Sequence, residues 1–213
     1  MPLTHPAPAH ARPSGLFRRL APWLVIVLLG LTPLAAQAQQ CFVNGAFGME
    51  FGSVNASGKA STSTVQYACQ NYAAPVEYFH ICLFMGPGQF SAGQPTRRMY
   101  NYSSQTYLNY DLFSDAAHSN RIGAPGTTPV YRLSLTVSQG QQISSAAMIH
   151  GLVYPGQATT AGNFQEQGIS GTLRYRFSSS PFTSSADCSS GGQGGCTDTF
   201  NSSGVRAQFD NSC

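Results

Sequence analysis

The chain has 213 residues and a formal charge of +3 at pH 7, with 11 Lys and Arg against 8 Asp and Glu. Only 9% of the residues are charged, whereas Gly, Ser, Thr, Gln, Asn and Tyr are abundant. This composition is unlike that of a helical bundle or a cytosolic enzyme, and it is typical of an extracellular β protein with a neutral, polar surface.

The first 38 residues have the pattern of a secretory signal peptide. A basic start that includes Arg18 precedes the apolar run 20–34, and a small-residue cleavage site ends at Ala38. The apolar run is too short, and too interrupted by proline, for a membrane span. Cleavage would leave 175 residues (213 − 38) with eight basic (11 − 3) and eight acidic residues. We therefore expect an exported, nearly neutral protein with no electrostatic attraction for nucleic acid.

The cysteines all follow the predicted cleavage site, at positions 41, 69, 82, 188, 196 and 213. In an exported chain they indicate a disulfide framework, whose connectivity their number alone does not give. A zinc site is the competing interpretation. However, there is no C-x-x-C pair, and the histidines after the signal, His80, His118 and His150, are far apart. The sequence therefore predicts no metal site.

Short segments of alternating apolar and polar residues follow one another along the chain. The expected strands are 41–52, 61–69, 76–85, 107–113, 130–137, 148–154 and 169–177. Segment 76–85 is apolar on both faces after Tyr78, which predicts a central strand or one leading into an apolar loop. About seven strands without helical periodicity predict an all-β sandwich in one domain.

The segment 107–123 carries the most distinctive pattern, L-x-Y-x-L-F-x-D-A-A. It resembles the signature of the spore coat protein U domain family, which includes subunits of archaic chaperone–usher pili. The matching residues are Leu108, Tyr110, Leu112, Phe113, Asp115, Ala116 and Ala117. His118 and Ile122 stand where the family often has Arg and Trp. Arg98-Met99 and the block 155–164 resemble further landmarks of the family.

The resemblance implies an immunoglobulin-like pilin sandwich over residues 39–177, with a disulfide between Cys41 and Cys69. Such pilins have an open groove, which the N-terminal arm of the next subunit fills as a donor strand. The implied partners are a periplasmic chaperone, an outer-membrane usher and neighbouring pilus subunits. The implied location is the cell surface, reached through the periplasm.

Residues 178–213 differ in composition from the rest. A Ser- and Gly-rich stretch, with Cys188 and Cys196 closing a small loop, precedes a weak strand over 205–209. Two interpretations stay open. Either the segment ends in a C-terminal strand that is pinned by a disulfide and closes the groove of its own sandwich from within, or it is a linker in which Cys213 begins a second, missing domain.

Cleavage after Ala38 would leave only Gln39 and Gln40 ahead of Cys41. A donor strand needs about 10 residues, because each residue advances the strand by about 3.3 Å. Such a subunit could not donate a strand and would occupy the tip of a fibre. We therefore expect a tip adhesin, most like the N-terminal domain of a two-domain adhesin, that binds surfaces in attachment and biofilm formation. The alternatives are a structural shaft or coat subunit and, because tyrosines are many, a lectin-like secreted module.

Apolar and aromatic residues on Gly- and Pro-rich loops are the candidate contacts with an abiotic or host surface. The candidates are Phe84, Met85, Phe90, Tyr100, Tyr102, Ile122 and Phe182. The alternative for each of them is a side chain that folds back onto the core.

No catalytic constellation is expected. Asp111, Asp115 and His118 lie close together in the sequence, but Asp115 suits a role in capping backbone N–H groups of the turn that begins at Ser114. No nucleophile elbow, H-E-x-x-H motif or phosphate-binding loop occurs. His80 and His150 fall inside expected strands and are interpreted as structural. We expect no enzymatic activity and no cofactor.

Overall fold

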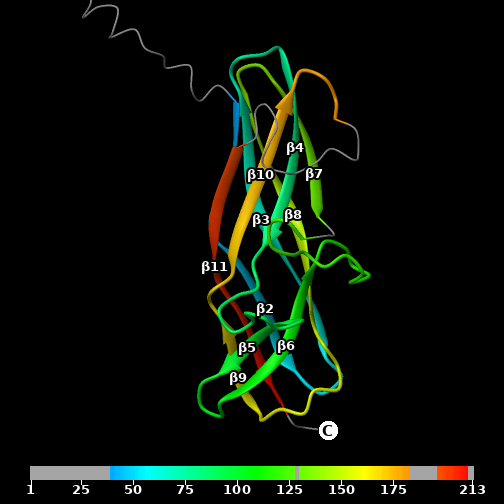
Figure 1. Cartoon of the computed structure of the whole chain (residues 1–213), viewed down its shortest axis with the longest axis vertical. Coiled ribbons are helices and arrows are strands. Elements are labelled where there is room, and N and C mark those ends of the chain that lie inside the picture. Colours follow the sequence, from blue (N-terminus) through cyan, green and yellow to red (C-terminus); the bar gives the residue numbers. More distant parts are fainter. Residues whose placement is uncertain (1–38, 128–129, 183–195, 211–213) are drawn as a thin grey trace, which may run out of the picture. The chain divides into compact units, whose positions relative to one another are not determined.

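The computed structural model describes residues 39–127, 130–182 and 196–210, which form strands, turns and loops (Figure 1). Nowhere in these residues is there a helix that could span a membrane. The strands are β1 (Gln39–Val43), β2 (Phe47–Val54), β3 (Lys59–Asn71), β4 (Val76–Met85), β5 (Arg97–Asn101), β6 (Thr106–Phe113), β7 (Tyr131–Ser138), β8 (Gln141–Val153), β9 (Gly162–Glu166), β10 (Ser170–Ser178) and β11 (Cys196–Phe209).

The strands form two layers that share β11. One layer follows the order β1-β3-β8-β6-β5-β9, and the other follows β10-β4-β7. In Figure 1, β11 (orange-red) runs along β10 (gold) and continues beside β9. Buried apolar side chains from both layers, such as Ile81 of β4 and Ile149 of β8, belong to a single core. The predicted all-β, immunoglobulin-like sandwich is confirmed.

The described residues contain more strands than the sequence predicts. The expected strand 41–52 is broken at Gly45, which has a φ of +90° that other residues rarely adopt. β5 and β9 have only five residues each, which is too short for an alternation to stand out. β11 has an irregular pattern because two register shifts interrupt its pairing with β2.

β4 is a central strand, as one of the two interpretations of its sequence predicts. It has the expected bounds and lies between β10 and β7. Its alternation places Phe79, Ile81 and Leu83 in the core between the layers. The residues between them are buried as well, which explains why the segment is apolar on both faces.

β6 and the turn after it contain the L-x-Y-x-L-F-x-D-A-A motif. Leu108, Tyr110 and Leu112 point into the core and are fully buried. Ala116 and Ala117 lie exposed in the turn that follows the strand. The strand half of the motif is therefore a packing pattern, and its second half is a turn on the surface.

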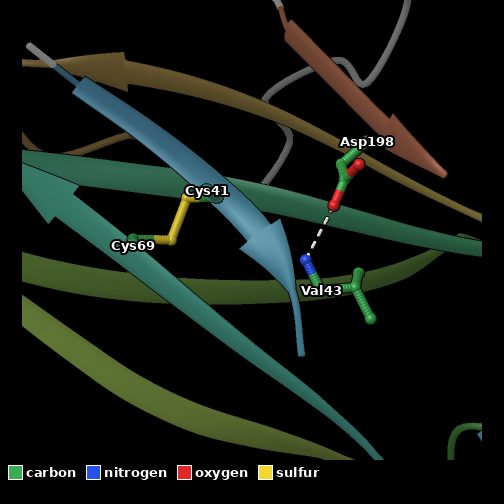
Figure 2. Close-up of a disulfide and its surroundings, with 4 residues drawn as sticks. All are labelled: Cys41, Val43, Cys69 and Asp198. Carbon is green, nitrogen blue, oxygen red and sulfur yellow. Dashed lines mark hydrogen bonds between the residues drawn. A yellow bond between two sulfur atoms is a disulfide. The ribbon is translucent and has the colours of Figure 1, made fainter. Parts of the chain in front are cut away.

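The predicted disulfide between Cys41 and Cys69 is confirmed (Figure 2). The two residues are direct partners in the antiparallel register of β1 and β3. Figure 2 also shows the side chain of Asp198, in β11, accepting a hydrogen bond of 2.8 Å from the backbone N–H of Val43. β1 is thus fixed covalently to one neighbour and through a charged side chain to another.

Cys82 is disulfide-bonded as well, whereas Cys196 is an exposed free thiol. The expectation that Cys196 closes a small loop with Cys188 is therefore wrong. Cys196 is the first residue of β11 and pairs across the sheet with Tyr175 of β10, so a strand holds it in place without a disulfide. Cys188 and Cys213 lie outside the described residues.

β11 lies in the seam between β2 and β9. Its second half is antiparallel to β9 on one side and parallel to β2 on the other. Val205, Ala207 and Phe209 point into the core and are at most 5% exposed. Gly204, with a φ of +124°, lies at the register shift that precedes them. The segment 205–209 thus occupies the place of a closing strand.

Candidate functional site

Three of the residues expected at exposed loop tips are buried. Phe84, Met85 and Ile122 are 3%, 0% and 1% exposed, so the prediction that they contact a surface is wrong. Phe84 and Met85 still belong to β4 and do not lie in the loop after it. Ile122 is part of the core. Phe182 is half-buried, and its ring centroid lies 5.6 Å from that of His80.

The other three expected residues lie together, and Tyr107 joins them. Phe90, Tyr100, Tyr102 and Tyr107 form what we call the aromatic patch. The ring centroid of Tyr100 lies 5.1 Å from that of Phe90, 4.9 Å from that of Tyr102 and 5.0 Å from that of Tyr107. Tyr102 and Tyr107 are 59% and 43% exposed. The patch is therefore a cluster of packed rings with two faces open to solvent.

Pairing between β5 and β6 builds this patch. Tyr100 and Tyr107 are direct partners in the antiparallel register, and Tyr102 lies in the turn that joins the two strands. Tyr107 is not among the residues that the sequence predicts to contact a surface. Its outward direction nevertheless follows from the alternation in β6, because Leu108 and Tyr110 face the core and Tyr107 must then face outward.

Phe90 reaches the patch from the loop after β4, and two charged residues hold it there. The carboxylate of Glu166, which is fully buried in β9, accepts hydrogen bonds from the backbone N–H groups of Gln89 (3.0 Å) and Phe90 (3.2 Å). The guanidinium of Arg98 donates two hydrogen bonds to the carbonyl of Phe90 and lies 4.3 Å above the ring of Tyr107. These contacts fix the patch before any ligand arrives.

A groove of about 790 Å³ borders the patch at Tyr102. Its lining comes from β2, the end of β5 with the turn after it, β9 with the segment that leads into it, and β11. The lining residues are Glu50, Gly52, Ser53, residues 101–104, residues 160–165 and residues 206–208. Arg206 and Glu50 form an ion pair of 3.4 Å at the groove, and both side chains are more than half exposed. This pair therefore gives the groove no net charge.

A buried ion pair anchors the strands that carry the patch. Asp111 of β6 is fully buried and accepts hydrogen bonds from Arg97 (2.9 Å), Arg121 (3.2 Å) and the hydroxyl of Tyr154 (3.1 Å). Burial, followed by the charge of Asp111, raises the pKa of Tyr154 to about 12. Asp111 is therefore occupied by structural partners, and the arrangement does not resemble an acid–base catalyst.

Among the described residues, Asp115 and Asp111 share no hydrogen-bond partner. The carboxylate of Asp115 accepts hydrogen bonds from the backbone N–H groups of Ser119 (3.1 Å) and Asn120 (2.7 Å), which confirms the expected capping role. His118 packs edge-on against Phe113. Within residues 39–127, 130–182 and 196–210, no group of three or more His, Cys, Asp or Glu side chains is arranged to hold a metal ion.

Acid titration is expected to open the turn that Asp115 caps. Hydrogen bonds, first that from the Ser119 hydroxyl, lower the pKa of Asp115 from 3.8 to about 2. Because the pKa of Asp115 is lower in the folded protein than in the unfolded chain, the ionised carboxylate stabilises the fold above about pH 4. This stabilisation is lost as the pH falls through about 2. NMR should show the amide signals of Ser119 and Asn120 shifting with a midpoint near pH 2. Ser119→Ala should move that midpoint upward, and an ordinary midpoint in the unmodified protein would contradict the assignment.

Comparison with protein families matches residues 27–167 to the Spore Coat Protein U domain. The chain belongs to the spore coat protein U domain family. The resemblance seen in the sequence is thereby confirmed. In this spore coat protein U domain, the matched region includes β1 to β9 and ends before β10 and β11. A comparison with curated proteins finds no match.

Solved structures with a similar course of the chain include two from pili. The CooA pilin subunit of enterotoxigenic Escherichia coli is 11% identical with a TM-score of 0.37, and the match covers 81% of this chain and 99% of the pilin. The CupB6 tip adhesin of Pseudomonas aeruginosa is 12% identical with a TM-score of 0.38, over 82% of this chain and 42% of the adhesin.

A third similar structure is a family 123 glycoside hydrolase from Clostridium perfringens. It is 10% identical with a TM-score of 0.28, over 83% of this chain and 28% of the hydrolase. With TM-scores at this level, none of the three structures carries an argument about what the spore coat protein U domain does.

Proposed function

We propose that this spore coat protein U domain is the adhesive domain of the tip subunit of an archaic chaperone–usher pilus. Membership of the family supports a pilus subunit of the chaperone–usher type. On this proposal the protein is exported through the periplasm, with a periplasmic chaperone, an outer-membrane usher and neighbouring subunits as its partners. It acts at the cell surface, in attachment and biofilm formation, and has no enzymatic role.

The position of β11 carries the assignment to the tip. A shaft subunit takes a donor strand from its neighbour into an open groove. Here the seam between β2 and β9 holds a strand of the same chain, and its apolar side chains are buried. Gln39 and Gln40 of β1 pair with Asn71 and Gln70 of β3, so neither is a free arm for another subunit. These features support a domain that folds without a neighbour's strand.

The aromatic patch is the proposed contact with a surface. Of the residues expected to bind, it keeps Phe90, Tyr100 and Tyr102, and it adds Tyr107. Tyrosine rings combine a large apolar face with a polar hydroxyl, which suits binding at the boundary between water and a solid. Because Glu166 and Arg98 hold the rings in place, binding needs little further ordering.

Adhesion to polystyrene tests this proposal. The double substitution Tyr102→Ser and Tyr107→Ser is expected to lower adhesion of the full chain about 10-fold or more, since two exposed aromatic contacts are removed. Tyr72→Ser is the matched control, because Tyr72 is 54% exposed but lies in the turn between β3 and β4. Unchanged adhesion in the double variant would show that the aromatic patch is not the contact with the surface. Loss of adhesion only in Tyr72→Ser would place the contact at that turn.

A further inference from the structure

We propose that the groove beside Tyr102 is a binding site for an uncharged oligosaccharide. The inference rests on the proposed adhesive function for its setting, but apart from Tyr102 it depends on side chains outside the aromatic patch. The groove has a volume of about 790 Å³, which lies within the range of roughly 300–1,000 Å³ that is usual for small-ligand sites. Its chemistry then decides which ligand it suits.

The charges of the groove exclude an ionic ligand. Arg206 and Glu50 are the charged residues of its lining, and they neutralise each other across 3.4 Å. A phosphate, a sulfate or a sugar acid would find a carboxylate beside the only guanidinium in this lining. A cation would find a guanidinium beside the only carboxylate in this lining. A neutral ligand encounters neither repulsion.

The remaining polar groups of the groove are amides and hydroxyls. Asn163, Ser103 and Thr160 are exposed, and their side chains form no hydrogen bond with the described part of the chain. The side chain of Gln208 at the same groove donates a hydrogen bond of 3.3 Å to Asp210 on the surface, and to no other described residue. Amides and hydroxyls both donate and accept, as sugar hydroxyls do, so the two sets can pair throughout.

Tyr102 supplies a flat apolar wall for this polar groove. Its ring meets Tyr100 at 80° and Phe90 at 76°, so edge-to-face packing on two sides fixes its direction. A sugar ring has an apolar C–H face that packs against an aromatic face while its hydroxyls reach polar groups. The groove offers both kinds of contact next to each other.

An extended peptide is the competing ligand for the groove. β11 lies between β9 and β2, but in the described part of the chain β2 pairs with no strand other than β11, and β9 meets β5 at the single pair of Tyr100 and Gln165. A peptide that adds as a strand uses such an unpaired edge and binds through backbone hydrogen bonds. A glycan is instead recognised by side chains, so substitution of the amide side chains of the groove distinguishes the two ligands.

Titration of the full exported chain with maltohexaose, cellohexaose and mannohexaose, followed by NMR, tests the site. At least one oligosaccharide is expected to bind. Asn163→Ala with Gln208→Ala should weaken that binding about 10-fold, as expected for the loss of two or more ordinary hydrogen bonds. The matched control is Gln70→Ala with Gln142→Ala, a pair of partners in β3 and β8 away from the groove. The control variant should bind as the unmodified chain does.

A further variant separates this site from surface adhesion. Thr160→Ala removes one exposed hydroxyl of the groove and no ring of the aromatic patch, so it should weaken oligosaccharide binding several-fold and leave adhesion to polystyrene in place. Absence of binding by all three oligosaccharides, or equal binding by both double variants, would overturn the inference. Polystyrene adhesion of the unmodified chain tests the adhesive function independently, so either can fail while the other stands.

Discussion

Removal of β11 is expected to leave the rest of the sandwich unable to fold as a monomer. The truncation would expose the core positions covered by Val205, Ala207 and Phe209, which are at most 5% exposed in the intact chain. Replacing a buried Phe by Ala alone costs about 3–5 kcal/mol. A domain is stable by only about 5–15 kcal/mol, so losing these core side chains together with Phe200 and three ladders of backbone hydrogen bonds exceeds its stability.

A synthetic peptide of residues 196–210, added in trans, should restore the fold. The measurement is the fraction of soluble monomer after refolding a chain that ends at residue 195, with circular dichroism to report the sheet. The matched control is the same peptide with Val205, Ala207 and Phe209 replaced by Ser, which should not restore it. A truncated chain that folds alone would show that β11 is not the closing strand.

The same peptide distinguishes a tip from a shaft subunit. In a self-closed adhesive domain, β11 is held at high effective concentration by its own chain, so excess peptide should not exchange into the intact protein. In a subunit built for donor-strand exchange, the seam must accept a strand from outside. Incorporation of labelled peptide into the intact chain, measured by mass spectrometry, would favour the shaft role over the proposed tip role.

Local patterns in the sequence are sufficient for β4, β6, β7 and β10, whereas the longest strands, β8 and β11, extend well beyond the expected segments 148–154 and 205–209. β4 was predicted with its observed bounds, and the alternation in β6 placed Leu108 and Tyr110 in the core, where they lie. Alternation is a property of neighbouring residues, so it can be read without knowing the partner strand. β5 and β9, with five residues each, depend on pairing with distant strands for their existence and gave no comparable signal.

The candidate site was harder to predict because distant residues shape it. Phe90 is fixed by the carboxylate of Glu166, which lies 76 residues further along the chain. The sequence predicts an exposed loop at Phe84 and Met85, because the Gly- and Pro-rich residues after them mark the end of a strand but do not show which elements cover it. Their burial follows from the packing of β4 among other elements, which no local pattern encodes.

The buried ion pair is expected to give the largest single-residue loss of stability. Arg97 bonds Asp111 at 2.9 Å and donates to the carbonyls of Met85 (2.6 Å), Gly86 (3.0 Å) and Ile122 (2.8 Å). Both charged side chains are at most 5% exposed. Arg97→Ala removes one partner, leaves Asp111 with a buried charge that is poorly compensated, and frees three carbonyls. The expected cost is about 3–5 kcal/mol.

Arg121→Ala is the matched control, because Arg121 bonds the same carboxylate but its side chain is 48% exposed. Its loss should cost no more than about 1 kcal/mol. Urea unfolding with the disulfides intact measures the free energy of unfolding of both variants. Equal losses would show that the buried pair of Arg97 and Asp111 stabilises the fold no more than the exposed contact of Arg121 does. Arg97 also ties β5, the strand of Tyr100, to the end of β4. The Arg97→Ala variant should therefore lose adhesion to polystyrene in proportion to its loss of structure, whereas Arg121→Ala should retain both.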